Sequence, residues 1–286
     1  MIKIIPDQEI NKTIAEQIQR FRKIHVLIDP QINDNFFYEN DIEFDSIVPI
    51  RDRQDTVSYN HECLQLCTLK KGAEDDIKHI IANLKNQQSS VIAMITSPYP
   101  IKDIQQHISN AMFMLHQGNY YLLRFYDPHV LKHLVTIFDE EQINKMLGSV
   151  QYWYYWQDEY VQLHHKPELI LWDIKYKITT QQWRKIKIAQ SYNAYEQQTV
   201  KLQKKPLTDV QQNTLTQLLD WIYTATFYEP DQQKMDYIVE YAMAKSEHFF
   251  QKIEYDLFVD LMRNQKISQL EHYFNHIDKE QEHVSD

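Results

Sequence analysis

The residue with the most unusual surroundings in this sequence is Arg124. It lies in the run YYLLRFYDPHVL, residues 120–131, and every other residue from 120 to 126 is apolar or aromatic. A buried guanidinium needs a carboxylate or another strong acceptor, because an unpaired buried charge is costly. We therefore expect Arg124 either to pair with an internal carboxylate, such as Asp127 or Asp173, or to lie at a polar groove that receives another protein.

Two pairs of histidines have a spacing that could bind a metal ion. His129 and His133 are four residues apart, as are His272 and His276, so each pair would share one face of a helix. Neither pair has the glutamate of an HExxH motif or an evident third ligand. We favour solvent-facing histidines and no bound cofactor, and a metal-dependent hydrolase using His129 and His133 is the alternative.

The remaining reactive residues have simpler explanations than catalysis. Asp75 and Glu140 each begin a pair of adjacent acidic residues at a predicted helix start, where carboxylates stabilise the helix dipole. Cys63 and Cys67 lie in a predicted strand, and four residues of strand span roughly 13 Å. That separation is too large for a disulfide or for a shared zinc ion, so we expect two free core thiols.

Composition excludes several functional classes. The chain has only three glycines in 286 residues, so neither a P-loop nor a dinucleotide fingerprint can be written from it. A formal net charge of -10 argues against nucleic acid and anionic membrane surfaces as partners. No apolar run approaches the length of about 18 residues that a membrane span requires, and no signal peptide is evident. We expect a cytoplasmic protein that is not an enzyme.

Hydrophobic periodicity predicts an α/β (α+β) lobe with a mixed sheet over residues 1–176. Asp127 and Pro128 have the residue types of an N-cap and a first helical position, so the strand predicted at 120–126 should turn directly into a helix. Gly118 should cap the helix before it. The predicted strands are 24–28, 44–50, 63–69, 91–96, 120–126, a hairpin within 150–165 and 168–174, and the predicted helices are 7–21, 73–85, 101–116, one following Asp127, and one from Asp139 to Gly148.

After residue 176 the pattern becomes helical throughout. Thr179 with Gln182, and Thr208 with Gln211, are capping-box signatures at the starts of two helices. Helices are predicted at 183–201, after Thr208, and at 232–250, 254–262 and 268–277. We therefore expect a helical second lobe over residues 177–286.

Consecutive aromatic residues at 152–156, YWYYW, include Trp153 and Tyr155. Side chains of one strand alternate between its two faces, so this strand should be apolar on both sides. Two readings are open: a strand buried in the core, or a sheet face kept for a partner protein, since Tyr and Trp dominate interface hot spots.

The segment around Arg124 resembles the RFYDPRVL-like signature of the type VI secretion adaptor chaperones, known as Tap or TEC proteins, with His129 in place of an arginine. The segment IHVLID resembles the family's opening strand, which ends in an aspartate, here Asp29. Gly148 and Trp153 resemble its GPV…W segment, with Ser149 in place of a proline. The motif residues are Asp29, Arg124, Tyr126, Asp127, Pro128, Trp153 and Tyr155.

This resemblance implies a cytoplasmic adaptor without a cofactor. It would bind a type VI secretion effector, through the effector's N-terminal segment, and help to load it onto the VgrG spike and its PAAR tip. An immunity protein that binds a toxin is a further alternative to the adaptor.

Overall fold

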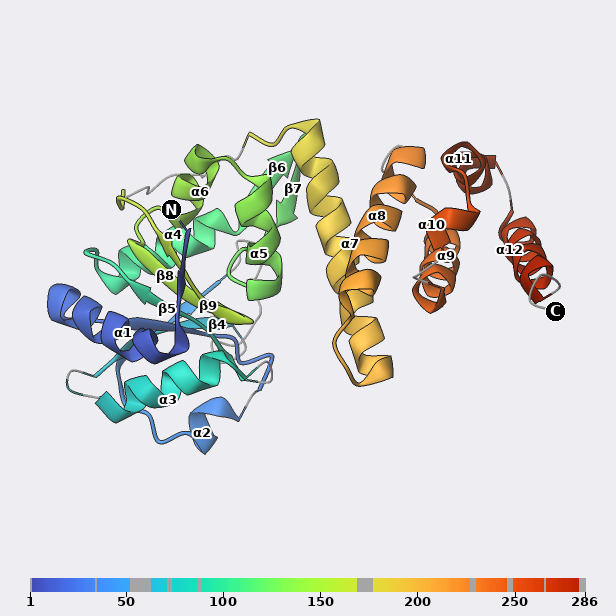
Figure 1. Ribbon diagram of the computed structural model, residues 1–286. Helices are drawn as coiled ribbons and strands as arrows, with labels where there is room; N and C mark the ends of the chain where they lie inside the picture. Colours follow the sequence, from blue (N-terminus) through green and yellow to red (C-terminus); the bar gives the residue numbers. More distant parts are fainter. Residues whose placement is uncertain are drawn as a thin grey trace. The chain divides into compact units, whose positions relative to one another are not determined.

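The computed structural model (Figure 1) describes residues 2–33, 35–51, 63–70, 72, 74–86, 89–168, 177–226, 230–245, 249–264 and 266–282. The chain divides into two compact units, Met1–Ile178 and Thr179–Asp286. The first combines a sheet with helices and the second contains only helices in its described part, which confirms the predicted fold class.

A seven-stranded sheet organises the first unit, in the order β1-β9-β8-β5-β2-β4-β3. Its central strands are buried on both faces, because every residue of β2, β4 and β5 is buried. The strands are β1 (Ile2–Ile5), β2 (His25–Ile28), β3 (Phe44–Ile50), β4 (Leu64–Leu69), β5 (Val91–Thr96), β8 (Tyr152–Gln157) and β9 (Glu159–His164).

Each of the strand pairings given for this sheet is antiparallel, so the mixture of strand directions predicted for it is wrong. The prediction rested on the alternation of strands and helices along the chain, a pattern typical of sheets that contain parallel strands. Here α3 (Glu74–Leu84) joins β4 to β5, which run in the same direction, but β2 lies between them and pairs with both. The crossover therefore produces no parallel neighbours.

Helices cover both faces of the sheet (Figure 1). On one face, α1 (Asp7–Phe21) and α3 pack over a core that includes Ile14, Val26, Met94 and Tyr154. On the other face lie α4 (Ile101–Ala111), α5 (Pro128–Ile137) and α6 (Glu140–Leu147). The sheet is thus the middle of three layers, which explains its continuous apolar strands.

The region between α4 and α5 differs from the prediction. The helix predicted at 101–116 ends at Ala111, and β6 (Phe113–His116) pairs with β7 (Asn119–Leu122) in a separate two-stranded hairpin. Gln117 and Gly118 both have positive φ, 48° and 83°, as a type I′ hairpin turn requires. Gly118 is therefore a turn residue and not a helix cap.

The prediction of a buried strand at 120–126 is also wrong. Strand β7 ends at Leu122 and is mostly exposed, and Arg124 lies in the irregular connection that follows it. The tyrosines and leucines of this run suggested a core strand, but short strands rich in aromatics also form exposed hairpins.

The second unit is an array of helices whose predicted starts at Thr179 and Thr208 are confirmed as capping boxes. Helix α8 is central, because it packs against α7, α9 and α11. Its buried face carries Leu215, Leu218 and Ile222. The helices are α7 (Thr180–Gln203), α8 (Asp209–Ala225), α9 (Gln232–Ala244), α10 (Phe249–Lys252), α11 (Tyr255–Asn264) and α12 (Ile267–Glu282).

Cys63 and Cys67 are buried free cysteines, as predicted. Burial raises the pKa of the Cys67 thiol to about 12, so this group stays protonated and unreactive. The strand predicted at 168–174 lies almost wholly outside the described residues, as does Asp173. Strand β1 and the short helix α2 (Phe36–Glu39) were not predicted. Within the described part of the chain, no helix has the length and apolarity needed to cross a bilayer.

Candidate functional site

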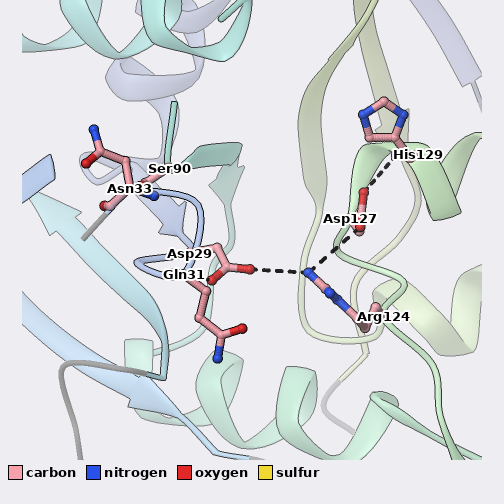
Figure 2. A network of polar contacts seen from close by, with 7 residues as sticks. All are labelled: Asp29, Gln31, Asn33, Ser90, Arg124, Asp127 and His129. Atoms are coloured by element: carbon pink, nitrogen blue, oxygen red, sulfur yellow. Dashed lines mark hydrogen bonds and ion pairs between the residues drawn. The ribbon is translucent and has the colours of Figure 1, made fainter. Parts of the chain in front are cut away.

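Arg124 lies between β7 and α5, where it contacts two carboxylates (Figure 2). Its Nη2 atom is 3.4 Å from Oδ2 of Asp29 and 3.9 Å from Oδ2 of Asp127. Asp127 was one of the two partners expected from the sequence, whereas Asp29 was expected only as a motif residue. The Arg124 side chain is 45% exposed and that of Asp29 only 6%, so the pair joins a buried carboxylate to a cation at the surface.

The backbone holds Asp29 in place at the end of β2. Its N–H donates to the carbonyl of Ser90 at 2.8 Å, and its Oδ1 accepts the N–H of Gln31 at 3.0 Å. The buried hydroxyl of Ser90 accepts the N–H of Asn33 and donates to the carbonyl of the same residue. These hydrogen bonds fix the turn after β2 to the start of β5, and Figure 2 shows Asn33 beside Ser90.

Burial is the largest influence on Asp29 and raises the pKa of its carboxyl group. The N–H of Gln31 and the charge of Arg124 act in the opposite direction, because both favour the ionised form. Arg124 is thus the cation that compensates a desolvated carboxylate, and Asp127 adds a second negative charge on the exposed side.

Asp127 and Pro128 have the roles predicted for them. The Asp127 side chain accepts the N–H of His129 at 2.9 Å as the N-cap of α5, and Pro128 occupies the first helical position. Tyr126 is buried, and the guanidinium carbon of Arg124 lies 5.6 Å from the centre of its ring. This short segment therefore links the start of α5 to the Asp29 carboxylate through one arginine.

Trp153 and Tyr155 lie in the core of the sheet. Both are essentially inaccessible to solvent, and the Trp153 ring is 5.6 Å from that of Phe125. For these two residues, the structure therefore agrees with a strand buried in the core and not with a sheet face kept for a partner protein. A partner that binds the folded chain does not reach these two side chains, although they support the segment that carries Arg124.

Gly148 allows the side chain of His107 on α4 to approach the backbone closely. A Cβ atom built on it would lie 1.9 Å from Cε1 of His107, and its φ of 49° is in the left-handed region. His107 is buried and lies 3.0 Å, through its Nε2, from the carbonyl oxygen of Met146. The glycine of the GSV segment is therefore required by packing against a histidine that the sequence pattern did not single out.

The described residues around Arg124 do not assemble a metal centre. Among the described residues, no group of three His, Cys, Asp or Glu side chains could hold a metal ion. His129 and His133 lie on α5 without a third ligand within that set. The groups that the structure brings together are one arginine, two carboxylates and the backbone of a tight turn.

Comparison with known families gives one match. Residues 60–145 match the family model described as "Domain of unknown function (DUF4123)". This domain family is associated with adaptors that load effectors in type VI secretion. The matched range includes Arg124, Tyr126, Asp127 and Pro128. No curated protein and no solved structure matches the chain.

Two parts of the site were not found from the sequence. Ser90 was not singled out, although a serine just before an apolar strand can fix a turn by hydrogen bonding. The β6–β7 hairpin was divided between a helix and a core strand. The dipeptide Gln117-Gly118 between two apolar runs was the available signal for a hairpin turn.

Proposed function

We propose that this protein is an adaptor chaperone that binds a type VI secretion effector and helps to load it onto the VgrG spike and its PAAR tip. The observation that carries the proposal is the match of residues 60–145 to a domain family associated with such adaptors. The Arg124 segment lies inside this range and is held by Asp29, the residue that the resemblance assigns to the end of the opening strand.

The geometry around Arg124 supports a binding role. Its guanidinium is half exposed and held by carboxylates on two sides, so its position is fixed before any partner arrives. Preorganised side chains lose less conformational entropy on binding. We propose that the protein acts in the cytoplasm, without a cofactor, by non-covalent recognition of the effector's N-terminal segment.

The test is capture of a toxin encoded in the neighbouring gene. The full chain should co-purify with that toxin and with the toxin's N-terminal segment alone, and adding VgrG and PAAR protein should give a larger complex. Capture of the isolated catalytic domain together with inhibition of its activity would instead identify an immunity protein. Failure of two folded proteins to associate would refute the adaptor proposal for that toxin.

A further inference from the structure

The outer edge of β7 is an open strand edge with exposed apolar side chains. Tyr120 is 55% exposed and Leu122 is 50% exposed, and the two alternate positions point to the same side of the strand. Across the hairpin, Leu115 faces Tyr120 and Phe113 faces Leu122. The β7 half of this side is therefore apolar and accessible next to the Arg124 segment, whereas Phe113 on β6 is buried.

The hydrogen-bond pattern shows which backbone groups of β7 point outward. The N–H of Leu123 donates to the carbonyl of Met112 at 2.6 Å. In an antiparallel pair, hydrogen-bonded and non-hydrogen-bonded residue pairs alternate. Tyr121 therefore bonds to β6, whereas the N–H and C=O groups of Tyr120 and Leu122 point away from it. Neither of these two residues has a further hydrogen-bond partner among the described residues.

The other described strand edges have features that discourage pairing. Strand β3 carries Pro49 and an irregular register after Phe44, and β1 carries Lys3. On β6, Phe113 and Met114 are buried. Charges, prolines and bulges are the devices by which proteins protect sheet edges. Strand β7, with sequence NYYL, has none of them.

We propose that the outer edge of β7 binds an extended segment of the effector as an added third strand, an inference that rests on the proposed adaptor function. Strand addition satisfies the outward N–H and C=O groups of Tyr120 and Leu122. Alternate apolar side chains of the segment pack on the side chains of the same two residues. The added strand would also complete a three-stranded sheet, which is more stable than an isolated hairpin.

Charge favours a foreign segment over a second copy of this chain. Residues 113–123 contain no lysine, arginine, aspartate or glutamate, while the whole chain carries a net charge of -10. Two copies would bring two such negative charges together, and an acidic segment would be repelled in the same way. The occupant is therefore an uncharged or basic segment with apolar residues at alternate positions.

The experiment measures binding of the full chain to the toxin encoded in the neighbouring gene, with a matched pair of variants. Leu122→Lys places a charge on the β7 edge, and Ile4→Lys places one on β1 at a side chain of similar exposure, 47%. We expect Leu122→Lys to weaken binding at least tenfold and Ile4→Lys to change it less than twofold. Circular dichroism establishes that both variants are folded.

Amide hydrogen exchange on the wild-type complex tests the backbone contacts without any variant. In the free protein, the amides of Tyr120 and Leu122 should exchange rapidly and that of Tyr121 more slowly. Added toxin should slow the exchange at Tyr120 and Leu122.

The outcomes are distinguishable. Capture of the toxin with no effect of Leu122→Lys and unchanged exchange at both amides would overturn the β7 site and leave the adaptor function standing. Absence of capture by the wild-type chain would overturn both. Slow exchange that depends on the concentration of this chain alone, together with a dimer in sedimentation, would show that a second copy occupies the edge and would overturn the proposed occupant.

Discussion

Arg124 carries the clearest test at the level of single residues. Replacing it by leucine removes the cation that compensates Asp29, whose carboxyl group is almost fully buried. We expect Arg124→Leu to lower the free energy of unfolding by about 1–3 kcal/mol at pH 7, because a desolvated carboxylate loses its partner.

The pH dependence of this variant distinguishes charge from packing. Removing Arg124 raises the pKa of Asp29 further, so the loss should shrink as pH falls and the carboxyl group becomes protonated. Denaturant unfolding at pH 7 and pH 5 measures the difference, with Arg124→Lys as the charge-conserving control. An equal loss at both pH values would show that packing, and not the ion pair, is what the variant removes.

The buried histidines lead to a second prediction for single residues, which concerns how stability depends on pH. Burial lowers the pKa of His25 from 6.5 to about 4 and also lowers the pKa of His165. Between pH 6.5 and about 4, the unfolded chain therefore binds more protons than the folded chain. The free energy of unfolding should consequently fall as the pH drops through this range. Asp29, whose pKa is raised, opposes this trend at the acidic end.

For His25 alone, the expected loss between pH 7.5 and pH 5 is about 2 kcal/mol. The His25→Gln variant should show a flatter dependence of unfolding free energy on pH, because glutamine does not titrate. Thr68→Val is the control, since it removes the hydroxyl 2.9 Å from His25 Nδ1 but keeps the imidazole. A pH dependence in His25→Gln as steep as that of the wild type would contradict the assignment.

At the level of elements, the connection from α6 to β8 depends on Gly148. A Cβ atom there would overlap the buried His107 ring, so Gly148→Ala should cost more than about 3 kcal/mol through overpacking and backbone strain. Gly118→Ala is the matched control, because Gly118 also has positive φ but nothing lies within 4 Å of its added Cβ. We expect this control to cost about 1 kcal/mol.

Thermal unfolding of both variants measures the comparison. The double variant His107→Ala with Gly148→Ala should recover part of the loss, because the clash disappears when the ring is removed. Similar costs for the two glycine variants would show that backbone conformation, and not the histidine, imposes the glycine.

The sequence was most informative where local chemistry determines an element. The helix at Asp7–Phe21, the strand at Val91–Thr96 and the cap at Asp127 were predicted correctly, because periodicity and capping act over a few residues. Strand direction was not predictable, since it depends on β2 lying between β4 and β5. The ion pair from Arg124 to Asp29 crosses 95 residues of chain, and no local pattern specifies it.

The β6–β7 hairpin was not predicted from the sequence, for a different reason. The composition of residues 113–122 is compatible with a helix, a core strand or an exposed hairpin. In the structure Tyr120 and Leu122 are exposed, which distinguishes the hairpin from a core strand. Side chains kept exposed for a partner look like core residues in a sequence. Errors of this kind are expected at binding sites, where local preference and function conflict.

At the level of the whole molecule, we predict that the two units unfold separately. Each has its own core, with Leu218 and Phe258 in the helical unit and Val26 and Tyr154 in the other. Native-state hydrogen exchange should therefore show two groups of amides with different opening free energies, separated near residues 176–180. A single opening unit across both would contradict this prediction.

The same division allows the binding function to be assigned to one unit. We expect residues 1–176 to capture the neighbouring toxin and residues 177–286 to capture none, because the matched range 60–145 lies in the first unit. Co-purification with each fragment and with the full chain measures this, and circular dichroism checks that each fragment is folded. Capture by the helical fragment alone would place the site in the second unit.

The pairing of β1 with β9 bears on how the protein is synthesised. Ile2 lies opposite Leu163, so β1 must wait for β9, which is translated later than every other strand of this sheet. At cellular translation rates, on the order of 10 to 30 s pass between them. During that interval the exposed isoleucines of β1 have no partner strand. We therefore expect ribosome-associated chaperones to bind the nascent chain before β9 is available to pair with β1.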